Sequence, residues 1–357
     1  MRLFAFYLPQ FHQIPENDEW WGKGFTEWTN VKKAQPLFKG HVQPLHPLNG
    51  NYYDLLDRKT VEWQTELMHK YHVDGLIYYH YYFSGKMLLE KPAENLLKNT
   101  DIDQPFFFCW ANHDWNRSWQ GSRELLQKQT YGGKEDWEAH FRYLLPFFKD
   151  SRYEKKDGCP LLMIFDSGFA EKDEMFAYLD QRAKQEGFGG LCLIETFNGP
   201  DFPNGFDSFR AQKSAQTQYL FLREPTISRG IYWTTLKNLP LRIITHIKAR
   251  KDPSVFHVLK GSDLVAQEIK KEPVAEDVIH GVHFGFDNTS RHGRRGFVIT
   301  PPSRQSFEKL MDHLKGERYV FLNAWNEWAE AMTVEPTEEY GYSFLEWIKD
   351  WREKNNV

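Results

Sequence analysis

The stretch YVFLNAWNEWAEAMTVEP, residues 319–336, begins as an apolar run and continues as a cluster of polar and aromatic side chains. Residues 319–322 have the continuous apolar character of a strand that is buried on both faces. Glu327 and Glu330 follow three residues apart, with tryptophans beside them. The pattern predicts a buried strand that is followed directly by two carboxyl groups, which lie in a functional site.

The same pattern, an apolar run that ends in polar or special residues, recurs along the chain. The runs lie at 2–9, 73–83, 105–112, 159–168, 190–199, 206–212, 280–288 and 319–328. Stretches with helical spacing of apolar residues separate most of them, at 60–72, 135–148, 172–187 and 303–317. Eight buried strands that alternate with helices predict an α/β protein of the (β/α)8 TIM-barrel class.

Residues 213–279 lack this alternation. We expect a single catalytic domain over 1–357, in which 213–279 is an elaborated βα connection after strand 6 at the barrel mouth. A separate small domain over 213–279 is the alternative.

Composition excludes several classes of function. The formal net charge is −4, without a basic tail or a Lys/Arg stripe, which argues against a nucleic-acid partner. No apolar run approaches the roughly 18 residues that a membrane span needs, and the N-terminus lacks the features of a signal peptide, so a cytoplasmic location is expected. Cys109, Cys159 and Cys192 each lie inside an apolar run, which predicts core thiols in a reducing compartment. The sequence does not set the oligomeric state.

No cofactor is expected from the sequence. The histidines show no His-x-x-x-His pattern and no tight cluster with carboxylates, so no metal site is predicted. Phosphate-binding glycine loops are absent as well. Most glycosyltransferases that use nucleotide sugars need a nucleotide-binding fold or an Asp-x-Asp metal site, and neither is evident.

Glu327 and Glu330 suit the cleavage of a glycosidic bond. Such a reaction needs one carboxyl group to protonate the leaving oxygen and another to act as base or nucleophile. Neighbouring tryptophans can raise a carboxyl pKa by excluding water. The alternative interpretation is a solvated helix N-terminus, where acidic residues are favoured by the helix dipole.

In a (β/α)8 barrel the chemistry collects at the C-terminal ends of the strands. The side chains there are rich in Trp, Tyr, His and charged groups, which suits a sugar-binding pocket. The predicted substrate-binding residues are Tyr7, His12, Glu27, Trp28, His80, Trp110, Asn112, His113, Trp115, Trp119, Asp287, Asn288, Arg291, Asn326 and Trp328. His12 can equally be a structural histidine, and Arg291 can either hold an anionic sugar substituent or form a salt bridge within its loop. Glu335 is expected to fix its own loop.

Two families share motifs with this sequence. WNEWAEAMTVEP (325–336) resembles the FNEWHEG…IEP stretch of glycoside hydrolase family 99, the endo-α-mannosidase family. Nearly the whole chain resembles the WbsX-type proteins, a bacterial group related to family 99 and labelled as glycosyltransferases of polysaccharide biosynthesis. The motifs that carry the second resemblance lie at 7–31, 36–48, 75–92, 110–121, 148–165, 286–291 and 321–336.

The resemblance to family 99 implies roles for the two carboxyl groups. Glu327 would act as a base on the sugar's own 2-hydroxyl, giving an epoxide-like intermediate and retention of configuration, and Glu330 would be the general acid and then the base. The sequence departs from the family patterns at three positions. Ala329 replaces a His and Ala331 replaces a Gly, which puts mannose specificity in question more than the catalytic pair. His113 stands where WbsX-type sequences commonly have a Glu, which changes the local charge.

These features favour a retaining, family-99-like glycoside hydrolase that acts on an α-linked bacterial polysaccharide or oligosaccharide. The missing export signal favours a biosynthetic role instead, as a WbsX-type glycosyltransferase or transglycosylase in O-antigen or capsule assembly. A glycan-binding protein without activity is the third alternative, but it would not need an acid/base pair.

Overall fold

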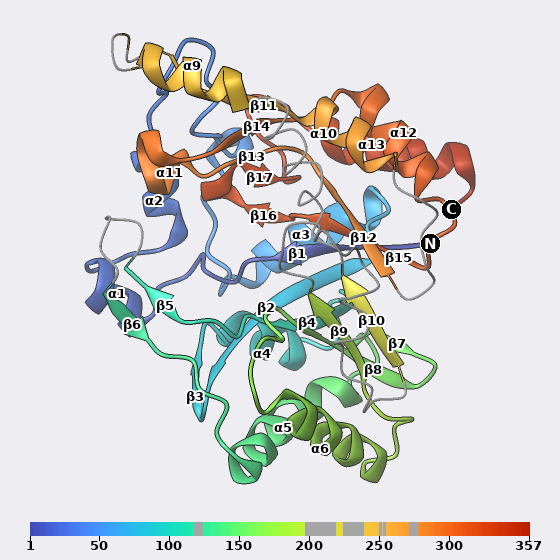
Figure 1. Cartoon of the computed structure of the whole chain (residues 1–357). Helices are drawn as coiled ribbons and strands as arrows, with labels where there is room; N and C mark the ends of the chain where they lie inside the picture. The colour runs from blue at the N-terminus through green and yellow to red at the C-terminus, as the bar shows by residue number, and fades with distance from the viewer. Residues whose placement is uncertain (118–123, 197–218, 224–238, 250–251, 253–254, 271–277) are drawn as a thin grey trace.

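A computed structural model describes residues 1–117, 124–196, 219–223, 239–249, 252, 255–270 and 278–357. The expected strand at 206–212 and Trp119 lie outside these residues, as does much of 213–279. The protein has a mixed α/β fold (Figure 1).

Within the described residues the main sheet has ten strands, and eight of them pair with one another in parallel only. In chain order they are β1 (Arg2–Tyr7), β2 (Gly75–Phe83), β4 (Phe106–Trp110), β8 (Cys159–Ile164), β9 (Cys192–Thr196), β10 (Tyr219–Arg223), β12 (Val278–His283) and β15 (Tyr319–Asn323). Each strand pairs with the next in this order, and β15 pairs with β1. Every one of the eight therefore has two parallel neighbours.

The position between β9 and β12 differs from the sequence prediction. The strand that pairs there is β10, which lies inside the segment expected to be a connection. Its apolar run, Tyr219–Leu222, is only four residues long and is bounded by polar residues, which is why it does not stand out from loop sequence.

Helices follow most strands of the main sheet. They are α1 (Pro15–Trp21), α2 (Glu27–Lys33), α3 (Arg58–Lys70), α4 (Lys91–Lys98), α5 (Lys134–Lys149), α6 (Lys172–Gln185), α9 (Leu239–Ala249), α10 (Gly261–Glu268), α11 (Thr289–His292), α12 (Arg304–His313) and α13 (Ser343–Asn355), with 3-10 turns η1 (Leu48–Gly50), η3 (Gly293–Arg295) and η4 (Trp328–Glu330). The four helical stretches expected from the sequence correspond to α3, α5, α6 and α12. Within the described residues, no helix combines the length and apolar character that crossing a bilayer requires.

Short strands either pair with the main sheet or form small separate sheets. They are β3 (Lys86–Leu88), β5 (Trp115–Asn116), β6 (Leu125–Gln127), β7 (Lys155–Lys156), β11 (Val258–Lys260), β13 (Phe286–Asp287), β14 (Val298–Thr300), β16 (Asn326–Glu327) and β17 (Met332–Thr333). The chain termini lie close together (Figure 1), since Arg352 of α13 donates a hydrogen bond to the backbone oxygen of Met1.

Aromatic rings pack against one another between the strands of the main sheet. Phe4 packs edge-on against Phe107 with 5.2 Å between ring centroids, and Phe6 contacts both Phe321 and Tyr79. All three cysteines are buried, as the sequence predicted, and no disulfide joins them. Because successive side chains of a strand point to opposite faces, Tyr79 and its neighbour His80 on β2 must face different layers.

His80 faces α5, where its Nε2 lies 2.9 Å from Nε2 of His140. Both imidazoles are buried, and burial lowers the pKa of His80 to about 3 and that of His140 well below its ordinary value. A histidine that is neutral when folded and charged when unfolded stabilises the fold above its unfolded pKa of 6.5. That stability is lost as the pH falls below this value.

We expect the free energy of unfolding to drop as the pH falls from about 7.5 to 5.5, with each buried histidine contributing a slope of at most about 1.4 kcal/mol per pH unit. His80→Asn removes one titrating group, so the drop should be smaller than in the wild type. Urea denaturation at the two pH values measures it. His313→Asn, at a half-buried position on α12, serves as the control and should leave the drop unchanged.

Candidate active site

A cavity of about 400 Å³ opens at the C-terminal ends of the main strands. Its lining residues follow or end β1, β2, β4, β8 and β15, and come also from neighbouring loops. They are Leu8, Gln10, Trp21, Tyr79, Tyr81, Ala111, His113, Asp114, Trp115, Asn116, Leu126, Phe165, Arg291, Glu327 and Glu330. Residues from several main strands and the loops after them therefore line one cavity.

One tight turn carries Glu327 and Glu330. Glu327 ends β16, which pairs antiparallel with β17, and Glu330 ends the 3-10 turn η4 between these strands. Ala331 closes the turn in the left-handed region, at φ 44°. Glycine adopts this conformation without steric cost, so the Gly that the family 99 motif has here would suit the same turn.

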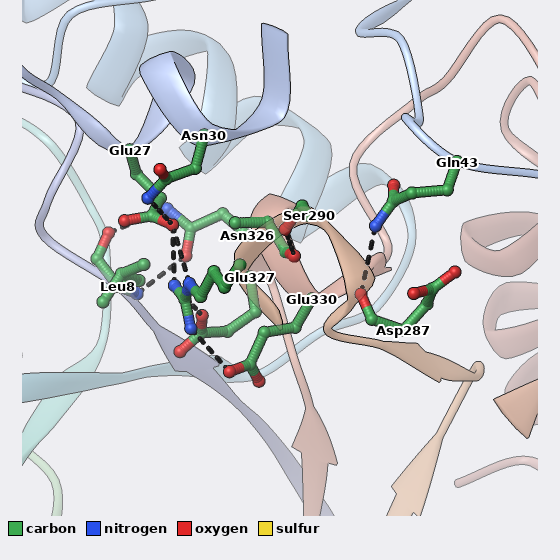
Figure 2. A network of polar contacts seen from close by, with 11 residues as sticks. Leu8, Glu27, Asn30, Gln43, Asp287, Ser290, Asn326, Glu327 and Glu330 are labelled. Atoms are coloured by element: carbon green, nitrogen blue, oxygen red, sulfur yellow. Dashed lines mark hydrogen bonds and ion pairs between the residues drawn. The ribbon is translucent and has the colours of Figure 1, made fainter. Parts of the chain in front are cut away.

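Arg291 of α11 joins three carboxyl groups from different parts of the chain. Its Nε and Nη2 donate to Glu27 Oε1 at 3.1 and 2.7 Å, and its Nη1 donates to Glu330 Oε1 at 2.6 Å. Nη2 also lies 3.9 Å from Glu327 Oε2. Figure 2 shows Glu27, Glu327 and Glu330 converging on this point. One buried cation thus faces three acidic groups.

Burial and the neighbouring charges shift the pKa of Glu327. Burial, together with the charge of Glu330, raises the pKa of Glu327 to about 8, although the Arg291 guanidinium opposes the shift. The guanidinium pKa of Arg291 is raised by its acidic partners despite its burial. These effects favour the protonated form of Glu327 in the unliganded protein, while Glu330 is ion-paired with Arg291.

Two hydrogen-bonded contacts fix α11 and thereby Arg291. Ser290 donates its hydroxyl to the backbone oxygen of Ala329 in the turn that carries the glutamates (Figure 2). Asp287 accepts from the backbone N–H and the hydroxyl of Thr289, at 2.9 and 2.6 Å. His41 completes this support, because its Nδ1 accepts from the Leu37 N–H, which leaves Nε2–H to donate to Asp287 at 2.5 Å.

Asp287→Asn should disturb this support without touching the cavity. An amide in place of the carboxylate either faces the His41 Nε2–H with a second donor or loses the acceptor for Thr289. We expect a loss of about 1–3 kcal/mol in unfolding free energy and a lower rate of glycan turnover, because Arg291 is no longer held in place. Chemical denaturation and turnover at saturating substrate measure both effects. A variant as stable and as active as the wild type would show that Asp287 does not position Arg291.

Glu335 is another buried carboxyl group, and it bonds side chains of the turn and of neighbouring elements. It accepts hydrogen bonds from Tyr53 Oη, Gln64 Nε2, Trp325 Nε1 and Trp328 Nε1, at 2.6–2.9 Å. Burial raises the pKa of Glu335 to about 7, and these donors oppose the shift. The contacts agree with the expectation that Glu335 fixes its loop.

The structure places the predicted site residues in two groups. Five of them line the cavity, namely His113, Trp115, Arg291, Glu327 and Glu330, and Glu27 lies directly behind Arg291. The others that are described lie outside the lining: Tyr7, His12, Trp28, His80, Trp110, Asn112, Asp287, Asn288, Asn326 and Trp328. Trp119 lies outside the described residues.

Most residues of the second group bind the protein itself. Tyr7 donates to Gln64, and the indole N–H groups of Trp28 and Trp110 donate to backbone oxygens. Asn326 bonds both the N–H and the oxygen of Leu8. These side chains therefore bond other protein atoms, and none of them lines the cavity.

The remaining members of this group also meet protein atoms. Asn112 donates to the backbone oxygen of Asp166. The side-chain oxygen of Asn288 accepts from the backbone N–H of Phe297. His12 is buried.

Sequence reasoning missed several residues that line the cavity, including Gln10, Trp21, Tyr79, Tyr81 and Asp114. The two tyrosines could have been found from strand alternation, because Tyr79 and Tyr81 share one face of β2 while His80 points to the other. Among the described residues, no group of three or more His, Cys, Asp or Glu side chains is arranged to hold a metal ion.

Comparisons with known proteins give a family and a fold. The family described as Glycosyltransferase WbsX matches residues 3–348. Two curated relatives, both called Uncharacterized protein WxcX, come from Xanthomonas campestris pv. campestris and are 30% and 31% identical over 96% of this chain. The match covers 48% of their length, so the chain spans about half of these relatives.

Solved structures with a similar fold include two carbohydrate-related proteins. A GH99 endo-alpha-mannosidase from Bacteroides thetaiotaomicron has a TM-score of 0.55 and 13% identity, covering 100% of this chain and 99% of that one. A protein described as glycoside hydrolase-like has a TM-score of 0.61 and 10% identity, with 99% and 93% covered. At these identities the likeness shows the fold alone.

Proposed function

The chain belongs to the WbsX glycosyltransferase family, and from this membership and the geometry of its carboxyl cluster we propose a specific role within carbohydrate chemistry. We propose that it is a retaining, family-99-like enzyme that acts on α-linked bacterial polysaccharide through Glu327 and Glu330. The observation that carries the proposal is the placement of both carboxyl groups on one turn, facing a cavity of about 400 Å³. That volume lies in the range of small-ligand pockets.

The proposed architecture is a single (β/α)8 barrel. The circuit of parallel pairings, in which each of eight strands has two neighbours, supports it. The position of the cavity at the C-terminal strand ends also supports it, because active sites of such barrels lie there.

The proposed reaction uses one proton shared by the two carboxyl groups. The raised pKa of Glu327 favours its protonated form in the unliganded protein, whereas the family resemblance gives Glu327 the role of base and Glu330 the role of acid. We propose that an entering glycan displaces Arg291 from Glu330, and that the proton then passes to Glu330. Ionised Glu327 takes the proton of the sugar 2-hydroxyl as its oxygen attacks the anomeric carbon, and Glu330 protonates the leaving oxygen.

The remaining lining residues suit a sugar. Tyr79, Tyr81, Trp21, Trp115 and Phe165 offer aromatic faces and edges for the apolar sides of sugar rings. His113 is also at the cavity, and burial lowers its pKa, so it presents a neutral imidazole that can donate or accept hydrogen bonds.

Mass spectrometry of products tests the proposal. The protein is incubated with α-linked bacterial polysaccharides in ordinary water and in water labelled with heavy oxygen, beside Glu327→Gln and Glu330→Gln. New reducing ends that carry the label, and that both variants fail to produce, are expected. If no glycan is changed under any condition, with or without a sugar acceptor, the enzyme proposal is wrong and glycan binding remains.

A transferase is the second candidate, and the family description favours it. The same carboxyl pair would serve, with a sugar hydroxyl in place of water as the acceptor. Products that contain an added sugar, and no heavy oxygen at a reducing end, would identify this reaction.

A further inference from the structure

Helix α9 presents an apolar face to solvent. Ile243, Ile244 and Ile247 are 54%, 46% and 55% exposed, although isoleucine is normally buried. Their spacing of one, three and four residues places them on one side of the helix. Figure 1 shows α9 at the edge of the molecule, away from the main sheet.

The sequence around this helix has a charge unlike that of the rest of the chain. Between Glu224 and Asp252 there are six Lys and Arg residues and no Asp or Glu, whereas the whole chain has a net charge of −4. The basic residues are Arg229, Lys237, Arg242, Lys248, Arg250 and Lys251. Lys248, on α9 itself, is exposed beside the isoleucines.

We propose that α9 is an interfacial helix that places Ile243, Ile244 and Ile247 in the surface of an anionic lipid bilayer. A helix with an apolar face in a basic sequence is the usual form of such an element, and it lies in the membrane plane. With 11 residues, α9 is too short to span a bilayer. The Lys and Arg residues are attracted to the negative lipid headgroups.

The charge of this segment also favours an anionic bilayer over a second copy of the chain as the partner of α9. Two copies that met through α9 would bring two basic stretches together, which like-charge repulsion opposes. An anionic bilayer offers both an apolar interior and the opposite charge. The inference does not depend on the reaction that the cavity catalyses.

Vesicle flotation with the whole chain tests the proposal. The probes are vesicles of phosphatidylcholine alone and of phosphatidylcholine mixed with phosphatidylglycerol, at low and high salt. We expect the wild type to bind the anionic vesicles at least about tenfold more strongly, and high salt to weaken this binding. Lys248→Glu should also weaken it.

The variant Ile243→Asp/Ile247→Asp should lose at least about tenfold of the vesicle binding, because charged groups replace the inserted side chains. Leu56→Asp is the matched control, since Leu56 is 43% exposed elsewhere on the surface, and it should bind as the wild type does. Circular dichroism checks that each variant is folded.

Three results would overturn the inference. They are wild-type protein that does not float with anionic vesicles, an unchanged Ile243→Asp/Ile247→Asp variant, and an equal loss in Leu56→Asp. A dimer in size-exclusion chromatography that only the isoleucine variant abolishes, without vesicle binding by the wild type, would assign the face to a second copy instead.

Discussion

Glu330→Gln will lower the rate of glycan turnover by ~10²–10⁴-fold, the contribution of a positioned general acid. The change is small in shape, and the carbonyl oxygen of Gln can still accept from Arg291 Nη1, which bonds Glu330 at 2.6 Å. The fold should therefore persist while the proton donor is lost. Turnover of a natural glycan measures the effect.

The leaving group of the substrate sharpens this prediction. An aryl glycoside with an acidic phenol leaves without protonation, so Glu330→Gln should retain far more of the wild-type rate on it than on a natural glycan. Glu327→Gln should be impaired on both substrates, because the base is needed whatever leaves. Glu66→Gln, an exposed carboxyl on α3, is the control. An equal loss on both substrates in Glu330→Gln would contradict the role of acid.

Arg291→Met has the second large effect, and it concerns stability as well as activity. Removing one member of a buried ion pair costs about 3–5 kcal/mol, because the partner keeps an uncompensated charge. Glu27 is fully buried and loses the guanidinium that bonds its Oε1. We expect a loss of this size in unfolding free energy near neutral pH, together with loss of turnover.

A double variant tests whether Arg291→Met loses stability through an uncompensated charge or through lost packing. Arg291→Met/Glu27→Leu removes the uncompensated carboxylate, so it should regain much of the lost stability without regaining activity. The single variant should also be less destabilised near pH 5 than near pH 8, since carboxyl groups can take up protons at lower pH. Urea denaturation of both variants at the two pH values measures this. A double variant no more stable than Arg291→Met would contradict the ion-pair account.

Local sequence predicted much of the fold and the position of one turn that faces the cavity. The apolar runs predicted seven of the eight main strands, because a strand buried on both faces shows itself in a short window. The turn that carries Glu327 and Glu330 could be predicted in the same way, since both residues directly follow one strand. Strand β10 was missed because its apolar run is only four residues long.

The rest of the site depends on contacts that sequence order hides. Glu27 and Arg291 meet although 264 residues separate them, and His41 meets Asp287 across 246 residues. These residue types indicated polar roles, but the neighbouring sequence did not indicate whether the side chains would face a ligand or each other. The direction of a side chain on a strand depends on register, and this decided that Tyr79 and Tyr81, not His80, line the cavity.

The most direct test of the central claim is the anomeric configuration of the first product. Proton NMR, recorded in the first minutes of reaction on a glycan that mass spectrometry has identified as a substrate, resolves it before mutarotation mixes the anomers. If the two carboxyl groups act through an intermediate, the configuration is retained. The account then predicts an α-linked transfer product, or a reducing sugar that first appears as the α anomer. Only the wild-type protein should form it. A β anomer formed first, or the same product from Glu327→Gln at the wild-type rate, would contradict the account.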